Sequence, residues 1–422
     1  MNKTQEYILG ILKDFDEMCS RNDIEYFLFR DTLMYGITSG SLGPKPYCAS
    51  VVMTGDNAAR LVEAFNREKP QNRVLDYWGS NERYPDYSIR YSDTESTDFN
   101  VMDFACYNAH GAYVDISILR GEKKSNKDCK QALLLERGVL LDSQNEKTTV
   151  TIPKNKYDAK ALAAYNLAKV RKGRGGIRKD LFDFFSSKCC APRSKSKGES
   201  GYYSVVMSPR KTSEIPQNYF RKCEYCTIGG YQFPVPADAR AMLSKLHPNR
   251  FTPGRNGDTV SDSFSYVENC IIDVDVPYRD MFDSGLITRE ELEAFRKQKF
   301  KVDMLVRSNR GNKKVTKDDL GIVAQTDYRF KMYEYYQPLK ADILKMLEAE
   351  DYEGLKEVFE PYEDRLDELL RDDKSFSFDN DILDAYLKLL DHEGDLDRID
   401  RILRFLPKSH LKDNDLVIGE TK

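Results

Sequence analysis

The stretch IEYFLFRDTLMYGITSGSLGPKPYCASVVM, residues 24–53, decides the fold. An apolar run at residues 24–29 is followed by a turn, a short apolar segment, a loop rich in Gly, Ser and Pro, and a second apolar run at residues 50–53. Short apolar runs rich in aromatic and β-branched residues and bounded by turn residues are typical of strands. The stretch therefore predicts a strand, a turn, a helix, a loop and a second strand.

The composition is that of an ordinary globular chain, with 422 residues, 40% of them hydrophobic, and 65 Lys and Arg against 69 Asp and Glu. This length accommodates two or three domains. The balanced charge disfavours nucleic acid as a partner, because proteins that bind it usually carry a basic excess. No apolar run approaches the roughly 20 residues that cross a bilayer. We expect no transmembrane segment and a cytoplasmic location, with attachment to the inner membrane face through a partner left open.

Ten positions in and beside the opening stretch fit one known pattern: Cys19, Ile24, Tyr26, Phe27, Leu28, Thr32, Leu33, Pro44, Val51 and Met53. With these residues the chain resembles the LicD family, whose members transfer phosphocholine or a similar phospho-alcohol from a CDP-activated donor to a glycan. The fukutin-type ribitol-phosphate transferases are relatives of that family. The resemblance implies an α/β (α+β) fold, in which a nucleotidyltransferase-like mixed sheet is flanked by helices.

The family's acidic run D-D-D-I-D falls on Pro46, Tyr47, Cys48, Ala49 and Ser50. Such transferases place two carboxylates at alternate residues of a strand, so that both hold a divalent metal beside the donor's phosphates. Those two positions are Cys48 and Ser50 here, and neither side chain replaces a carboxylate as a ligand of a hard cation. The resemblance therefore implies an impaired enzyme or a pseudoenzyme, and whether the chain is an enzyme stays open.

A third acid of the family lies on a later strand, and residues 113–119, YVDISIL, place Asp115 on it. Asp115 is thus the candidate catalytic and metal-binding residue. A single Asp could bind Mg²⁺ weakly, together with the phosphates of a nucleotide. The alternative for Asp115 is an ordinary acid at the end of a strand.

Three further residues are candidates for substrate binding. Asp31 replaces a family Gly in the turn nearest the donor phosphates, and Thr32 follows it. Arg90 lies in a segment similar to one around the family's donor site, and its planar fork suits a phosphate. The alternative for Arg90 is a cross-strand ion pair on a surface strand. An active phosphotransferase in which Asp115 rebuilds a metal site with Asp31 or Asp56 is the second interpretation.

Strand-like runs continue from residue 73 to residue 119, at residues 73–77, 87–91, 100–106 and 113–119. The sequence NAHG at residues 108–111 predicts a hairpin turn that joins the last two runs.

A helical stretch at residues 154–188 contains six bases around three glycines, at residues 169–179. These bases favour either an anion-binding loop or a solvated linker between helices. Farther on, residues 230–243 resemble the family's F-x-V-P-x-D segment, but the family's following Tyr-Gly-Asp is replaced here by residues 245–248, KLHP. The pair Cys223 and Cys226 could bind zinc, and the alternative is that both are free thiols.

Beyond about residue 325 the resemblance ends. Apolar residues at helical spacing predict four helices, at residues 328–349, 351–370, 382–392 and 396–405. Short connections between them favour an all-α region of helical hairpins, able to bind a protein partner.

The expected organisation is therefore a nucleotidyltransferase-like core at residues 1–150, a helical and substrate-side extension at residues 151–325, and a C-terminal helical domain at residues 326–422. The expected ligands are a CDP-alcohol nucleotide and a glycan acceptor. The resemblance implies the first two regions and the ligands, whereas the C-terminal helical domain is predicted from the helical spacing of its apolar residues.

Overall fold

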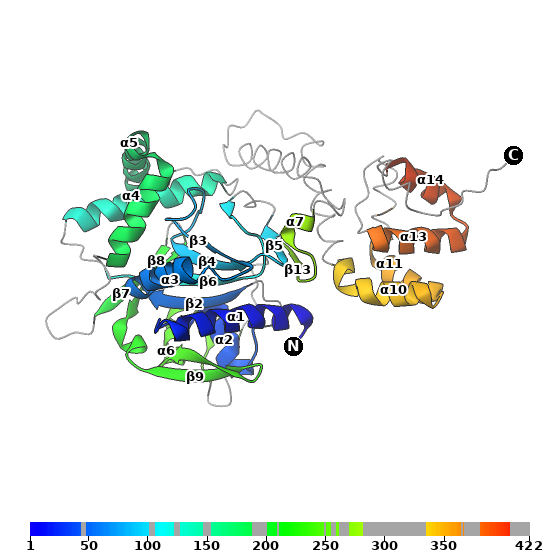
Figure 1. The fold of residues 1–422 in the computed structure, drawn as a ribbon, viewed down its shortest axis with the longest axis horizontal. Helices are drawn as coiled ribbons and strands as arrows, with labels where there is room; N and C mark the ends of the chain where they lie inside the picture. The colour runs from blue at the N-terminus through cyan, green and yellow to red at the C-terminus, as the bar shows by residue number, and fades with distance from the viewer. Residues whose placement is uncertain are drawn as a thin grey trace. The chain divides into compact units, whose positions relative to one another are not determined.

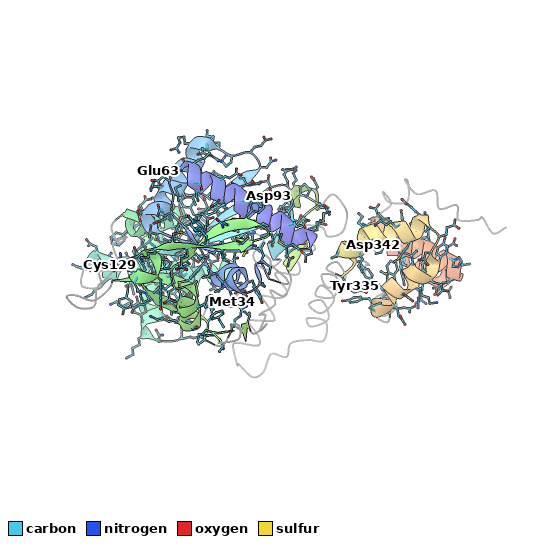
Figure 2. All side chains as sticks on the ribbon, turned by 90° about the horizontal axis from the view of Figure 1, so that it is seen from below. Met34, Glu63, Asp93, Cys129, Tyr335 and Asp342 are labelled. Atoms are coloured by element: carbon cyan, nitrogen blue, oxygen red, sulfur yellow. The ribbon has the colours of Figure 1, made fainter. Side chains whose placement is uncertain are left out.

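The computed structural model describes residues 1–43, 48–100, 106–121, 127–146, 153–187, 201–208, 211–248, 250–254, 259–260, 270–281, 335–363, 366 and 380–405. These residues form two compact units, one up to Tyr278 and the other from Arg279 onward. Figure 1 labels their helices and strands, and Figure 2 adds the side chains, with Met34 in the first unit and Tyr335 in the second. Pro46 and Tyr47 of the replaced acidic run lie outside the described residues.

A mixed sheet of five strands forms the centre of the first unit. Its strands, in spatial order, are β1 (Phe27–Leu28), β2 (Ala49–Thr54), β6 (Tyr113–Leu119), β4 (Ser88–Asp93) and β3 (Arg73–Asp76). β2 and β6 are parallel, and the other neighbouring pairs are antiparallel. The expected α/β class with a mixed sheet is confirmed.

One face of the sheet is apolar because alternate residues of each strand point to the same side. Val51, Ile116 and Ile89 are register neighbours on this face, and each is fully buried. Helices α1 (Lys3–Arg21) and α3 (Gly55–Glu68) cover this face, since their residues Phe15 and Phe65 both pack against Tyr91 of β4. The opposite face carries the polar residues that build the candidate site.

The remaining described elements of the first unit surround this sheet. They are α2 (Arg30–Ser39), β5 (Thr97–Asn100), α4 (Lys127–Glu146), α5 (Lys156–Ser187), β7 (Tyr202–Ser208), β8 (Lys211–Pro216), η2 (Gln217–Phe220), β9 (Cys223–Ile228), β10 (Tyr231–Pro236), α6 (Ala239–Leu246), β11 (Phe251–Thr252), β12 (Thr259–Val260) and β13 (Cys270–Asp273). One hydrophobic core runs from Ile8 to Phe251. Residues on both sides of position 150 therefore share a core and do not form two separate domains.

The expected hairpin between residues 100–106 and 113–119 is wrong. β5 pairs with β13, in the register Asn100 to Cys270, and β6 pairs with β2 and β4. Both edges of β6 are therefore occupied, and no edge is left to accept β5. Residues 101–105 lie outside the described residues.

The described part of the second unit is helical and has its own core. Its elements are η3 (Gln337–Leu339), α10 (Lys340–Glu348), α11 (Tyr352–Phe359), η4 (Glu360–Tyr362), α13 (Asn380–Glu393) and α14 (Leu396–Phe405), while α7 (Tyr278–Met281) begins at the division between the units. Ile343, Leu355 and Ile402 are fully buried in this core. Of the expected helices, those at residues 382–392 and 396–405 coincide closely with α13 and α14. In the described part of the chain, no helix is both long and apolar enough to cross a membrane.

Candidate functional site

A row of polar residues crosses four adjacent strands on the sheet face opposite α1 and α3. Asp76 of β3 is in register with Arg90 of β4, Arg90 with Asp115 of β6, and Asp115 with Ser50 of β2. Directly opposed residues of neighbouring strands project to the same face, with Cβ atoms about 5 Å apart. The row brings together Asp115, Arg90 and Ser50, three of the residues selected from the sequence.

The Asp115 carboxylate faces a cation at the first residue of α2. The Arg30 Nη1 atom lies 3.4 Å from Asp115 Oδ2, and both side chains are mostly buried. Arg30 holds a backbone φ of +48°, the left-handed conformation that costs an L-residue about 1–2 kcal/mol. Strain of this kind persists only where the surrounding structure imposes it, and it clusters at functional sites.

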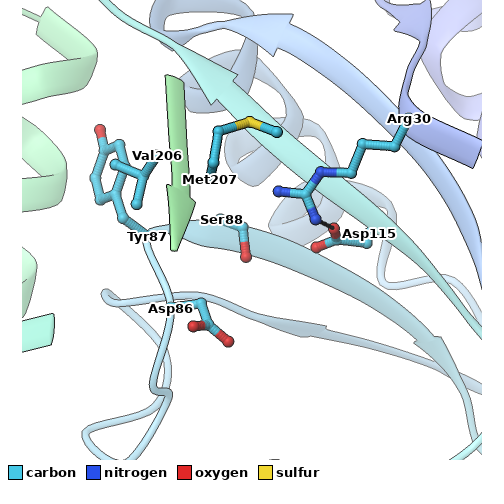
Figure 3. Close-up of a pocket in the computed structure, with 7 residues that line it drawn as sticks. All are labelled: Arg30, Asp86, Tyr87, Ser88, Asp115, Val206 and Met207. Carbon is cyan, nitrogen blue, oxygen red and sulfur yellow. Dashed lines mark hydrogen bonds and ion pairs between the residues drawn. The ribbon is translucent and has the colours of Figure 1, made fainter. Parts of the chain in front are cut away.

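A small cavity opens beside this ion pair. It has a volume of about 140 Å³ and is lined by Arg30, Asp86, Tyr87, Ser88, Asp115, Val206 and Met207. Figure 3 shows the Arg30 guanidinium turned toward Asp115, with Ser88 and Met207 beside them. Pockets for small molecules usually measure about 300–1,000 Å³. The cavity is therefore of a size for a small polar group and is smaller than a site for a whole nucleotide.

Cys48 and Ser50 occupy the two positions where the resemblance implies carboxylates. Cys48 Sγ lies 3.8 Å from Ser50 Oγ, and Ser50 is buried. Although Cys48 as a whole is half-buried, burial of its thiol raises its pKa, and the negative charges of Asp115 and Asp98 raise the pKa further. The thiol is therefore neutral at physiological pH. Neither residue lines the cavity, so both contribute shape and polarity near Asp115 rather than charge.

Thr32 has a structural role in the described conformation. Its hydroxyl accepts a hydrogen bond of 2.8 Å from the Ser50 backbone N–H, and the residue is buried. This bond fixes the first turn of α2 against the beginning of β2. Thr32 thereby sets the position of Arg30 relative to Asp115.

Asp31, the other predicted residue of this turn, is held by a distant arginine. Arg250 donates from Nη1 and Nη2 to the two carboxylate oxygens of Asp31, at 2.8 and 3.3 Å. His247 lies in the same neighbourhood. Burial lowers its pKa, the charge of Asp31 opposes that effect, and Arg250, Arg30 and Lys211 reinforce it. Three cations thus surround the Asp31 end of the site.

Arg90 lies inside the protein, away from the cavity. Only 5% of the residue is exposed, its Nε donates to Ser92 Oγ at 3.1 Å, and its guanidinium carbon lies 3.5 Å from the centre of the Tyr113 ring. Both interpretations from the sequence assumed an accessible guanidinium, for a phosphate or for a surface ion pair. The described Arg90 organises the sheet instead.

The donor atoms at this site do not fit Mg²⁺. Asp86 and Asp115 both line the cavity, but Asp115 already faces Arg30. Asp31 is neutralised by Arg250, and Cys48 is a protonated thiol. Asp56 follows the far end of β2, whereas Asp115 is aligned with the strand's beginning. Within the residues that the structure describes, no group of three or more His, Cys, Asp or Glu side chains is arranged to hold a metal ion.

The two cysteines considered for zinc are separated by their strand. Cys223 and Cys226 are three residues apart on β9, so their side chains point to opposite faces and their Cα atoms are about 10 Å apart. Two thiolates in this arrangement cannot chelate one ion. Cys226 instead packs against α2, where a Cβ atom added to Gly36 would lie 3.1 Å from the sulfur.

Several cavity residues had no signal in the sequence. Arg30 directly follows a strand that borders β2, which is the one hint that could have indicated it. Val206 and Met207 come from β7, far along the chain, and ordinary apolar strand residues reveal nothing about a long-range contact. Ser88 is the first residue of β4, and Asp86 lies two residues before it. The face of the sheet to which the side chains of β4 point follows from the strand register, which the sequence does not give.

Comparisons of the chain with protein-family models, with curated proteins and with solved structures found no match.

Proposed function

We propose that the protein is a LicD-like protein of cell-surface glycan modification whose site binds the phosphate end of a CDP-activated alcohol but is impaired in metal-dependent transfer. The observation that carries the proposal is the cross-strand row in which Ser50 and Asp115 occupy neighbouring strands, with Arg30 paired to Asp115. A site of this composition offers a cation where metal-dependent transferases offer carboxylates.

The chemistry of the residues supports binding more than transfer. The guanidinium of Arg30 can exchange the Asp115 carboxylate for a phosphate, because an arginine fork pairs with either anion. Transfer would also require stabilisation of the charge that develops on the phosphoryl group, which is commonly the largest contribution to catalysis. The cavity brings the carboxylates of Asp86 and Asp115 beside Arg30, and within the described residues no third His, Cys, Asp or Glu completes a group that could hold a divalent cation for that purpose.

Isothermal titration of CDP-choline and CDP-ribitol, with and without Mg²⁺, tests the proposal. We expect weak binding that does not depend on Mg²⁺ and is lost in Arg30→Ala. Asp115→Ala should bind at least as tightly, because Arg30 is then released from its partner. Arg67→Ala serves as the control, since Arg67 is an exposed arginine of α3 on the opposite side of the sheet.

Two results would contradict this proposal. Binding that requires Mg²⁺ and disappears in Asp115→Ala would support the second interpretation, an active phosphotransferase with a relocated metal site. The absence of nucleotide binding under every condition would contradict both the proposal and the second interpretation.

A protein-binding role of the C-terminal helices is a separate candidate. It is favoured by the independent core of the second unit and by its charge, since residues 340–405 contain about twice as many acidic as basic residues. A basic protein surface is the partner that this charge favours. Deletion of residues 326–422 should then abolish capture of such a partner while leaving nucleotide binding unchanged.

A further inference from the structure

The first half of α5 exposes large apolar side chains to solvent. Leu167 is 60% exposed, Val170 is 87% exposed and Tyr157 is 51% exposed. Single exposed apolar residues are ordinary, but a group of them on one element indicates a binding surface. Figure 1 shows α5 beside α4 at the periphery of the first unit.

Three cations share this helix face. Counting from Lys156, the residues Lys160, Ala163, Leu167 and Arg171 follow at helical spacing, so all five lie along one side of the helix. Other cations of the segment are engaged: Lys172 pairs with Asp180 at 2.5 Å, and Lys169 and Arg174 each lie 3.6 Å from Asp142. In the described part of the chain, Lys156, Lys160 and Arg171 have no such ion pair.

The face carries no opposing negative charge of its own. Asp158 is the single acid between residues 153 and 176, and it is fully buried, where it accepts hydrogen bonds from Arg137 Nε at 3.0 Å and Nη2 at 2.7 Å. Apart from Asn166, the exposed residues of this half-helix are therefore bases, small residues and large apolar side chains. We name Lys156, Lys160, Leu167, Val170 and Arg171 the α5 face.

The rest of α5 and its partner α4 hold this face firmly. Gly138 of α4 lies so close to α5 that an added Cβ atom would be 2.4 Å from the Ala161 carbonyl oxygen. Beyond a break in the helical backbone at Gly173, the second half of α5 is anchored in the core, where the Phe182 and Tyr77 rings lie 4.8 Å apart. The α5 face is thus presented on a fixed helix.

We propose that the α5 face binds the surface of an anionic phospholipid membrane. A helix that lies in the interface of such a membrane combines apolar side chains, which enter the headgroup region, with Lys and Arg, which meet the anionic headgroups. Leu167 and Val170 supply the first component, and Lys160 and Arg171 supply the second. Nucleic acid would use the cations but would leave the apolar side chains exposed, so lipid fits the whole face. The proposal does not depend on nucleotide binding at the Arg30 site.

Flotation of the full chain with vesicles tests the proposal. We expect binding to vesicles of phosphatidylcholine mixed with phosphatidylglycerol, and little binding to phosphatidylcholine alone. Lys160→Gln/Arg171→Gln should lower partitioning by roughly 30-fold, because each base near an anionic surface strengthens binding about fivefold. Leu167→Ser/Val170→Ser should lower it by at least roughly tenfold, through loss of apolar burial.

Matched variants show whether binding depends on the α5 face or on the total charge and hydrophobicity of the chain. Lys172→Gln/Lys179→Gln removes two charges from the same helix but spares the α5 face, and Leu396→Ser removes an apolar residue that is 66% exposed elsewhere. Both should bind like the parent chain. The single tryptophan, Trp78, is buried, so unchanged emission from it shows that each variant keeps its core.

Three outcomes would overturn the proposal. One is equal binding of the parent chain and the α5-face variants to anionic vesicles. Another is preferential binding of duplex DNA that the same variants abolish. The third is a dimer of the parent chain that Leu167→Ser/Val170→Ser dissociates, which would assign the face to a second copy.

Discussion

The polar row across the sheet ends differently on its two sides. At the β3 side, the fully buried Asp76 accepts hydrogen bonds from Asn108 N at 2.9 Å, Asn108 Nδ2 at 2.7 Å and Asn81 Nδ2 at 3.0 Å. At the β2 side, Asp115 faces Arg30 at 3.4 Å and lines a cavity. Both ends contain one acid and one arginine on adjacent elements.

The difference shows how the same residue types serve structure or binding. A fully buried carboxylate that accepts three hydrogen bonds holds several segments in place and has little left to offer a ligand. A carboxylate that lines a cavity and faces a strained arginine at 3.4 Å has one side open to a ligand. Residue type alone therefore does not distinguish the two roles, whereas full burial at Asp76 and access to a cavity at Asp115 do.

The largest effect on stability should come from removing the carboxylate of Asp76. Asp76→Ala leaves the amide groups of Asn81 and Asn108 without this acceptor and removes one of the negative charges close to the buried Arg90. We expect a loss of about 3 kcal/mol in the free energy of unfolding. Asp115→Ala should cost less than about 1 kcal/mol, because the pair it breaks is long and partly exposed.

Urea denaturation followed by the emission of Trp78 measures both variants in the first unit. Asp76→Asn is the matched control, since it keeps the shape and one acceptor oxygen and should lose less than Asp76→Ala. Equal destabilisation by Asp76→Ala and Asp115→Ala would show that the two ends do not differ in the way described.

The next largest effect concerns Cys48 and Ser50, which stand where the LicD family has carboxylates. Cys48→Asp/Ser50→Asp places two acids beside Asp115, and we expect a loss of about 2 kcal/mol without metal, because three carboxylates then repel in a half-buried site. Mg²⁺ should restore the melting temperature of this variant and leave that of the parent chain unchanged. Cys48→Asn/Ser50→Asn provides a similar shape without charge and should not respond to Mg²⁺.

The activity of this variant with Mg²⁺ provides a further test. Transfer from CDP-choline or CDP-ribitol by the Cys48→Asp/Ser50→Asp variant would show that the ancestral pocket persists. A variant that folds but ignores Mg²⁺ would contradict the alignment of Cys48 and Ser50 with the family's carboxylates.

A smaller effect should follow from the backbone at Arg30. Arg30→Gly and Arg30→Ala both remove the ion pair to Asp115, but only glycine adopts the +48° φ without strain. We expect Arg30→Gly to be more stable than Arg30→Ala by about 1 kcal/mol. Lys69→Gly and Lys69→Ala provide the comparison, because Lys69 has a φ of +46° at the end of α3, away from the cavity.

Denaturation of the four variants measures the two differences. Similar gaps at residues 30 and 69 would show that the strain at Arg30 is local to its backbone. No gap at residue 30 would mean that α2 shifts when the arginine is lost, and the strain would then depend on the pair with Asp115.

The sequence predicted the strands better than their partners. Alternating residues such as Val51 and Ile116 indicate that β2 and β6 are strands, and the mixed sheet agrees with that expectation. The hairpin at residues 108–111 was wrong because periodicity does not reveal that β2 and β4 already occupy both edges of β6. Pairing depends on contacts between segments that are distant in the chain.

The site shows the same limit. Asp115 and Ser50 were expected together, and the register places them on neighbouring strands. Arg30 was missed because its role depends on an unusual backbone angle and on a partner 85 residues away. Arg250, which neutralises Asp31 from 219 residues away, was missed for the same reason. Such neutralisation decides whether an acid can bind a metal, and no local pattern reports it.

The smallest effect should be the pH dependence contributed by His247, which lies near the Asp31 and Arg30 end of the row. Its pKa in the folded chain is below the ordinary 6.5, mainly through burial. The unfolded chain therefore binds more protons at mildly acidic pH, so the stability that His247 contributes is present above about pH 6.5 and is lost as the pH falls. Between about pH 7.5 and about pH 5.5, the parent chain should lose more stability than His247→Gln, by well under 1 kcal/mol because the ring is partly exposed. Urea denaturation at both pH values measures the stability that each chain loses. An equal loss of stability in the two chains would mean that Asp31 offsets the burial of the His247 ring and that the cations around it are screened.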